Sequence, residues 1–202
     1  TQTVAQIMRK AFPSADIYNV YGLTEASPRV AYLPPDEFDD NPASVGFPLE
    51  SLKAKVVDNE LLISGNSIMK GYYNNSEATA RAKQNEWLHT GDVAEMDKQG
   101  RIYIRCRKDN MIIRAGMNIY PQEIENALKE NDNITDVLAF GVKNDTVSEK
   151  IHIKVVTSLG KAEVYNICKQ KLPSYELPDV IDIVDELPRN ASGKVIRNAK
   201  GN

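Results

Sequence analysis

Residues 107–125, RKDNMIIRAGMNIYPQEIE, mark the point at which the pattern of this chain changes. Before them, short strand-like segments alternate with turns. After them, a helix pattern over 121–130 begins a series in which helices and strands alternate. This change predicts two domains, residues 1–106 and 107–202, with a polar boundary at 107–110.

The second domain is expected to be a small α+β domain. After the first helix, the apolar pattern predicts strands over 134–142, 150–157 and 180–184. A second helix is expected between the last two strands, with its apolar stripe at Val164, Ile167, Cys168 and Leu172.

The first domain is expected to be rich in strands. The segments predicted as strands are 16–20, 52–57, 60–64, 93–96 and 101–105, and Asp58-Asn59 is typical of a hairpin turn. A helix at the start of the chain and a short helix over 77–83, capped by Ser76, are also expected. The five prolines between Pro28 and Pro48 favour a long surface loop there.

Composition excludes several classes of protein. Of the 202 residues, 42% are hydrophobic and 26% are charged, which excludes a collagen-like or disordered chain. The net charge of -3 predicts no nucleic-acid partner, and the longest interior apolar run, 137–142, is too short for a membrane span. Two cysteines without a CxxC pattern, and no signal-peptide pattern, predict a cytoplasmic protein. Two scattered histidines predict no zinc site.

Four segments place polar residues and glycines where a simple core would have neither. In the first, 21–25, a tyrosine offers a face for stacking, and a hydroxyl and a carboxylate suit phosphate and Mg²⁺. In the second, 87–92, the aspartate after a glycine suits the two hydroxyls of a ribose. The third is 107–125, and the fourth, 187–194, ends in a lysine. Each alone is also compatible with an ordinary turn, a helix cap or a solvated surface.

Together and in this order, the four segments resemble the C-terminal part of the adenylate-forming superfamily, which includes acyl-CoA synthetases, amino-acid adenylation domains and luciferases. Further matches are Asn59-Glu60-Leu61 with Gly65, Gly71-Tyr72, Gly100-Arg101-Ile102-Tyr103, and the pair Glu123 and Glu125. The resemblance covers nearly the whole chain. It implies an α+β fold: a β-rich, barrel-like tail of the large AMP-binding domain over 1–106, then a small lid domain over 107–202 whose central sheet is flanked by helices.

The resemblance also implies a nucleotide site. Tyr21 corresponds to the residue that stacks on adenine, and Asn19 to a contact with the edge of the base. Gly22 lies in the same motif. Asp92 and Arg107 correspond to the pair that grips the ribose hydroxyls.

Catalytic and conformational roles follow from the same resemblance. Thr24 would contact the phosphate, Glu25 would hold Mg²⁺, and Lys194 would bridge the carboxylate and the α-phosphate. Asp109 lies where the family has its hinge, and Gly116 lies in the loop that lines the pantetheine tunnel. A lysine and Mg²⁺ suit this reaction physically, because two anions are brought together in its transition state.

The activity implied is that of an acyl-CoA synthetase-like ligase, an ATP-dependent acid–thiol ligase that forms AMP. It would activate a small carboxylic acid with ATP to an acyl-adenylate and pass the acyl group to CoA or to the phosphopantetheine of an acyl carrier protein. The phosphate-binding loop that members carry upstream does not occur here, so the chain resembles a fragment and the isolated chain is expected to be inactive. Two alternatives stay open: an amino-acid adenylation domain, and a non-catalytic docking module for a carrier protein.

Two positions depart from the family pattern. Cys106 and Ala115 stand where members usually have glycine. Because Ala115 adjoins Gly116, it is expected to narrow the loop that faces a pantetheine arm.

Overall fold

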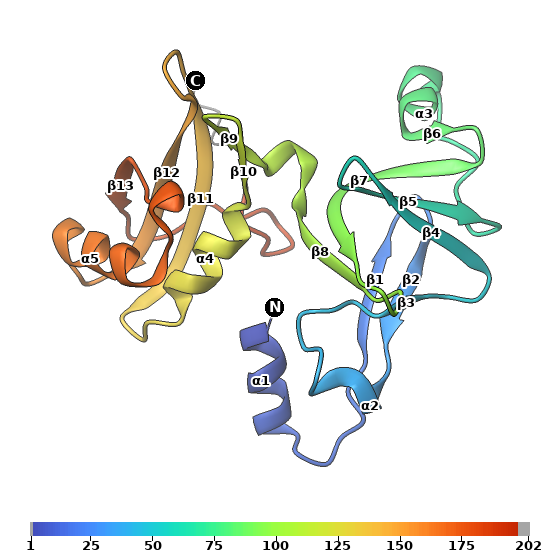
Figure 1. The fold of residues 1–202 in the computed structure, drawn as a ribbon, viewed down its shortest axis with the longest axis horizontal. Coiled ribbons are helices and arrows are strands. Elements are labelled where there is room, and N and C mark those ends of the chain that lie inside the picture. Colours follow the sequence, from blue (N-terminus) through green and yellow to red (C-terminus); the bar gives the residue numbers. More distant parts are fainter. Residues whose placement is uncertain (1, 198–202) are drawn as a thin grey trace. The chain divides into compact units, whose positions relative to one another are not determined.

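The computed structural model describes residues 2–197 and divides into two compact units. The first unit ends at Lys108 and the second begins at Asp109. Both units mix helices with antiparallel sheet, so the α+β class expected from the sequence is confirmed (Figure 1).

The first unit contains a three-stranded sheet in the order β1-β2-β3. Helix α1 (Gln2–Ala11) precedes this sheet, and the short helix α2 (Pro35–Phe38), with proline at its first turn, lies between its last two strands. The strands are β1 (Asn19–Leu23), β2 (Ser27–Leu33) and β3 (Phe47–Pro48). Three side chains of β2 are completely buried: Val30, Ala31 and Leu33. Val30 and Ala31 belong to the core that this sheet shares with the rest of the unit, whereas Leu33 packs in a smaller cluster with Ala5, Ile17 and Phe38.

A five-stranded sheet forms the rest of the first unit. Its order is β4-β5-β7-β6, with β8 on the same side of β7 as β6. The strands are β4 (Leu52–Val57), β5 (Glu60–Gly65), β6 (Lys83–Gln84), β7 (Trp87–Met96) and β8 (Ile102–Arg107). Positive φ angles at Asp58 and Asn59 close the β4–β5 hairpin, as predicted. Helix α3 (Ser76–Ala82) is capped by Asn75 rather than by Ser76, because Asn75 Oδ1 accepts the Ala78 N–H at 3.0 Å.

The second unit is built on two long strands. They are β11 (Ile134–Asn144) and β12 (Ser148–Thr157), which pair along their whole length. The hairpin β9 (Ile112–Arg114) and β10 (Met117–Ile119) pairs with the start of β12, and β13 (Val180–Ile183) runs parallel to its middle. A 3₁₀ turn, η1 (Lys108–Asn110), starts at the last residue of the first unit and leads into the second unit. A second 3₁₀ turn, η2 (Ser174–Glu176), precedes β13.

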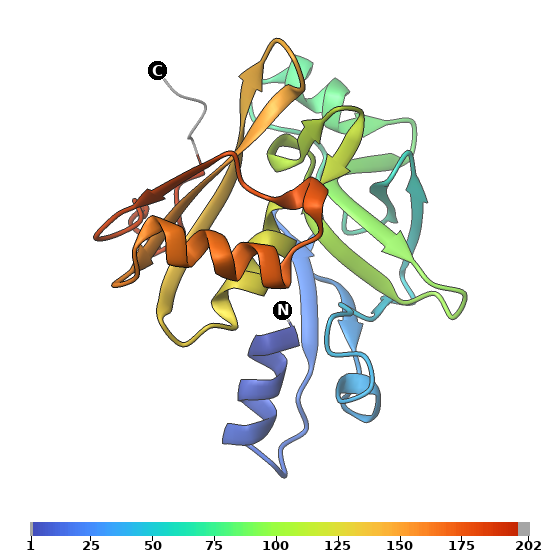
Figure 2. The ribbon, with the colours of Figure 1, turned by 60° about the vertical axis from the view of Figure 1, so that its left-hand side comes forward.

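Two helices cover one face of this second sheet. They are α4 (Pro121–Lys129) and α5 (Lys161–Lys171), and Figure 2 shows α5 running across the strands. Alternate residues of β12, Ile151, Ile153 and Val155, point to the same core as Leu128 of α4 and Val164 of α5. Both helices therefore lie on the same side of the sheet. Among the described residues, no helix has the length and apolar character that a membrane span requires.

The segment 28–48 was expected to be a surface loop, and this expectation is wrong. It contains most of β2, all of α2 and β3, and several of the most deeply buried side chains of the unit. Pro28 fits into β2 because the pairing of β1 with β2 is irregular between Tyr21 and Leu23, opposite this proline. The strand predicted over 16–20 begins later, at Asn19.

Candidate functional site

Three predicted nucleotide-site residues meet in one hydrogen-bonded network in the first unit. The Tyr21 hydroxyl donates to Asp92 Oδ2 at 2.5 Å, and Arg107 Nη1 lies 3.3 Å from Asp92 Oδ1. Arg107 Nη1 also donates to the Thr90 carbonyl oxygen at 2.6 Å. Burial and the adjacent Asp92 carboxylate raise the pKa of Tyr21 well above its ordinary value, so its hydroxyl stays protonated and donates. The network holds the Asp92 carboxylate in one orientation.

Strand pairing explains why these residues meet. Asp92 and Arg107 are direct partners in the antiparallel ladder of β7 with β8. On the other side of β7, the register with β5 slips: Leu62 faces His89, whereas Glu60 faces Val93. The extra residues of β7 form a bulge, and bulges re-aim side chains. Asp92 lies within this bulge, and its side chain contacts Tyr21.

A buried carboxylate on β5 supports this bulge. Glu60 accepts the Gly91 N–H at 3.0 Å, lies 3.3 Å from His89 Nδ1, and pairs with Lys108 Nζ at 3.1 Å. Burial alone would raise the pKa of Glu60, but the hydrogen bonds from Lys108, His89 and Gly91 outweigh it and lower the pKa below its ordinary value. Glu60 thus ties the bulge to the last residue of the first unit.

Thr24 and Glu25 form the tight turn between β1 and β2. The turn closes through the Ala26 N–H, which donates to the Leu23 carbonyl at 3.1 Å, so these residues do not begin a helix. Glu25 Oε1 accepts the Tyr72 hydroxyl at 2.8 Å, and this bond raises the pKa of Tyr72. The Arg107 charge opposes that rise, which places the Glu25–Tyr72 pair within electrostatic reach of the Asp92 network.

Glu25 has the chemistry of a magnesium ligand, since its half-buried carboxylate has further lone pairs beyond the one that Tyr72 occupies. Within residues 2–197, no group of three His, Cys, Asp or Glu side chains is arranged to hold a metal ion. A Mg²⁺ ion bound here would take its other ligands from water and phosphate oxygens, which is the usual mode for this ion. The residues present fit Mg²⁺ in that mode.

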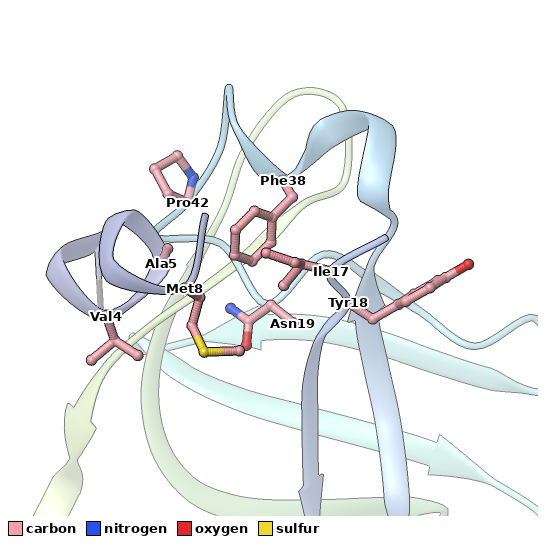
Figure 3. A pocket seen from close by; sticks show the side chains of 8 residues that line it. All are labelled: Val4, Ala5, Met8, Ile17, Tyr18, Asn19, Phe38 and Pro42. Carbon is pink, nitrogen blue, oxygen red and sulfur yellow. The ribbon is translucent and has the colours of Figure 1, made fainter. Parts of the chain in front are cut away.

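Asn19 and Gly22 lie on the same strand as Tyr21. The side-chain amide of Asn19 donates to the Ser44 carbonyl at 2.6 Å, and Asn19 also lines a small apolar pocket with residues of α1 and α2 (Figure 3). Asn19 and Tyr21 alternate with the exposed Val20, so they share one face of β1. At Gly22 a Cβ atom would lie 2.3 Å from the Pro28 carbonyl oxygen, so only glycine fits there.

The remaining predicted residues belong to the second unit. Asp109 is its first residue and lies in the 3₁₀ turn Lys108–Asn110. Gly116 and Ala115 form the two-residue turn of the β9–β10 hairpin, with φ angles of 81° and 50°. Apart from Gly116 and its two chain neighbours, no heavy atom of the described residues lies within 4 Å of the point where a Cβ at Gly116 would be, so the turn conformation rather than space calls for glycine. Lys194 is exposed, in a hairpin near the C-terminal end of the described residues.

Sequence reasoning gave no site role to Glu60, Tyr72 or Thr90. The signal for Glu60 was present, because a charged residue at the start of the otherwise apolar ELLISG strand needs buried partners. Tyr72 and Thr90 carry no such signal, because their importance depends on contacts with residues far away in the sequence.

Comparisons with known proteins show the family to which the chain is related. The AMP-binding enzyme family matches residues 1–73, and the AMP-binding enzyme C-terminal domain matches residues 123–194. A long-chain-fatty-acid–CoA ligase of Escherichia coli is 37% identical over 191 residues, covering 88% of this chain and 34% of the relative. A 2-succinylbenzoate–CoA ligase of Bacillus cereus is 32% identical over 193 residues, covering 90% of this chain and 40% of the relative.

A solved structure is also similar over the whole chain. The o-succinylbenzoate CoA synthetase of Bacillus subtilis, in complex with its acyl-adenylate intermediate, superposes with a TM-score of 0.90 at 28% identity, covering 100% of this chain and 44% of that one. The same enzyme has been solved with ATP and magnesium, with a TM-score of 0.89. The chain spans less than half the length of these relatives. The family matches, the curated relatives and the shared fold together identify this chain as a member of the adenylate-forming superfamily.

Proposed function

We propose that this chain supplies the nucleotide-binding strands and the lid of an AMP-forming acid–CoA ligase. The observation that carries the proposal is the Asp92 carboxylate, held between the Tyr21 hydroxyl and the Arg107 guanidinium. A fixed carboxylate beside a cation and an aromatic ring suits the ribose and base of a nucleotide. Residues 1–106 would then be part of the large domain, and residues 107–202 the lid.

In the proposed first half-reaction, the acid's carboxylate attacks the α-phosphate of ATP and pyrophosphate leaves. The Tyr21 ring stacks on adenine, Asn19 contacts the edge of the base, and Gly22 lets the strand approach closely. Asp92 and Arg107 hold the ribose. Thr24 contacts the phosphate, and bound Mg²⁺, held by Glu25, would supply charge neutralisation for the phosphates.

Lys194 supplies the mobile cation in this half-reaction. Its ammonium bridges the attacking carboxylate and the α-phosphate, where negative charge accumulates in the transition state. In the second half-reaction a thiol attacks the acyl-adenylate and AMP leaves. Asp109 is the hinge that lets the lid change position between the two steps, and Gly116 lies in the loop that faces the pantetheine arm.

CoA is the proposed acceptor of the acyl group, because the two relatives are a long-chain-fatty-acid–CoA ligase and a 2-succinylbenzoate–CoA ligase. A cytoplasmic enzyme would meet both ATP and CoA. The two cysteines, Cys106 and Cys168, are buried thiols that are not joined in a disulfide, which is compatible with that compartment.

A chimera tests the proposed function. In it, this chain replaces the matching 191-residue segment of the Escherichia coli ligase, which restores an upstream phosphate-binding part. With ATP, Mg²⁺ and a panel of fatty, aromatic and amino acids, we expect acid-dependent pyrophosphate release, followed by CoA-dependent AMP release. The Asp92→Asn chimera should release pyrophosphate more slowly and with a raised KM for ATP.

The parent ligase and the isolated chain are the controls. The isolated chain should release no pyrophosphate. A folded chimera that binds no ATP and releases no pyrophosphate with any acid would contradict the proposal, and release with amino acids alone would replace it with an amino-acid adenylation function.

A further inference from the structure

Lys194 belongs to a short hairpin, residues 189–195, which closes through a backbone bridge between Arg189 and Val195. Asn190 organises the turn. Its N–H donates to the Lys194 carbonyl at 2.9 Å, and its Oδ1 accepts the N–H groups of Ser192 and Lys194 at 3.1 and 2.9 Å. The side chain of Lys194 is exposed. The hairpin backbone therefore fixes the position of the Lys194 Cα atom and the direction of its Cα–Cβ bond.

An arginine fixes the first end of this hairpin to the sheet. Arg189 Nη1 donates to the Gly193 carbonyl at 2.8 Å, within the hairpin, while its Nη2 pairs with Asp136 Oδ2 of β11. Asp136 is 8% exposed and also accepts the Val137 N–H at 2.9 Å and pairs with Lys129 Nζ at 2.6 Å. The Arg189–Asp136 pair thus joins the hairpin that contains Lys194 to the beginning of β11.

A second arginine fixes the other end. Arg197 binds Glu125 of α4 with two parallel hydrogen bonds, Nη1 to Oε1 at 2.8 Å and Nη2 to Oε2 at 2.7 Å. Glu125 is 5% exposed, and its Oε1 also accepts the Ala139 N–H of β11 at 3.0 Å. Bidentate pairs of this kind restrict geometry as well as adding energy.

We propose that Asp136 and Glu125 are positioning residues for Lys194. Through Arg189 and Arg197 they clamp the two ends of the hairpin, so that the ammonium of Lys194 is presented from a rigid backbone rather than from a free tail. The clamps themselves are features of the second unit. Their effect on catalysis rests on the proposed function of Lys194, because a misplaced catalytic group loses much of its rate advantage.

Hydrogen exchange tests the clamps in the 202-residue chain. The variants Asp136→Asn and Glu125→Gln keep an acceptor for the Val137 and Ala139 N–H groups but remove the charge that binds each arginine. We expect at least about tenfold faster exchange of the Lys194 and Ile196 amides, since charge-assisted hydrogen bonds are the strong ones. Exchange in the core of β12 should stay unchanged.

The matched control is Glu130→Gln. It removes the same kind of charge from the end of the same helix and breaks the Lys171–Glu130 pair, which is 2.6 Å long and does not touch the hairpin. Its exchange in residues 189–197 should equal that of the unchanged chain. In the double variant Glu125→Gln/Arg197→Gln, the amides of residues 189–197 should exchange no faster than in either single variant. The effects of substituting two residues that bind each other are not additive.

The chimera described above tests the consequence for catalysis. Asp136→Asn and Glu125→Gln should lower the rate of pyrophosphate release by about tenfold or more. Conversion of supplied acyl-adenylate to thioester should stay within about twofold, since this step does not use Lys194. A purely structural role would lower both half-reactions together.

Each outcome decides a separate point. Unchanged exchange of the hairpin amides in both variants would overturn the clamps. Faster exchange with undiminished pyrophosphate release, or equal losses in both half-reactions, would overturn the positioning role. A chimera whose pyrophosphate release does not depend on Lys194 contradicts the proposed function instead, and the exchange data then still establish or refute the clamps.

Discussion

The Tyr21 side chain has two parts that do different work. Its ring face is the surface proposed to stack on a base, whereas its hydroxyl holds Asp92. Tyr21→Phe separates them, because phenylalanine keeps the ring and leaves a largely buried carboxylate with one partner fewer. We expect the free energy of unfolding of the first unit to fall by about 1–3 kcal/mol, the cost of an unsatisfied buried group.

Urea unfolding of the Tyr21→Phe chain measures this loss. Tyr73→Phe is the control. Tyr73 is 92% exposed, so removal of its hydroxyl group should leave the free energy of unfolding unchanged. Equal stability of the two variants would show that the Tyr21–Asp92 bond contributes nothing to the fold.

Ala115 occupies a backbone conformation that suits glycine. Its φ angle of 50° is left-handed, which costs a residue with a Cβ about 1–2 kcal/mol, partly offset by the larger entropy that glycine loses on folding. Ala115→Gly is therefore expected to stabilise the second unit by about 0.5–1 kcal/mol. Ala127→Gly, inside α4, should have the opposite sign. A destabilised Ala115→Gly chain would contradict the assigned turn conformation.

At the scale of elements, the bulge in β7 depends on a charge supplied by its neighbour β5. Glu60 has a lowered pKa in the folded state, so it binds its proton less readily there than in the unfolded chain. The stabilisation it gives is present above the unfolded pKa of about 4.3 and is lost as the pH falls through the lower folded value. Acid should therefore weaken the β5–β7–β8 region.

Glu60→Gln tests this pH dependence. The difference in unfolding free energy between the unchanged chain and this variant should be largest near about pH 6 and should shrink toward about pH 3. The exposed Glu86 provides a control, since Glu86→Gln at about pH 6 should leave the free energy of unfolding within about 0.5 kcal/mol of that of the unchanged chain. A constant difference for Glu60→Gln would mean that its charge has no stabilising partner.

Sequence patterns predicted elements best where each strand or helix has one buried face. The second unit is such a case: β11, β12, β13, α4 and α5 lie within a few residues of the expected segments, because each packs one regular stripe against a single core. The segment 28–48 failed for the opposite reason. Its prolines are local signals of a loop, but β2 is a strand because its pairing with β1 and the burial of Leu33 override them.

In the candidate site, too, some residues could be predicted from the sequence and others depend on contacts that only the fold makes. The motif residues Tyr21, Asp92 and Arg107 could be named from the sequence through a family resemblance, and the structure brings them into contact. Glu60 carries a sequence signal, a charge at the start of an apolar strand, but its partners could not be named from that signal. Tyr72 and the clamps on the Lys194 hairpin could not be assigned, because their partners are brought close only by the fold.

At the scale of the whole molecule, the chain consists of two units, each with its own core. Leu88 and Leu128 are completely buried, one in each core. Leu88→Ala should destabilise the first unit, and Leu128→Ala the second, by about 2–5 kcal/mol each. Hydrogen exchange under mild denaturant should localise each loss to residues before 108 or after 109. Loss of protection in both units from either variant would show that they unfold as one.

Lys194 is the residue proposed to act in acyl-adenylate formation, and separate measurement of the two half-reactions tests this role. In the chimera, Lys194→Ala should lower pyrophosphate release by about 10²–10³-fold, the loss typical of one charge-stabilising group, while thioester formation from supplied acyl-adenylate continues. Lys150→Ala, which removes another exposed lysine of the same unit, should change neither rate. Equal losses in both half-reactions, or no loss in the first, would contradict the proposed role of Lys194.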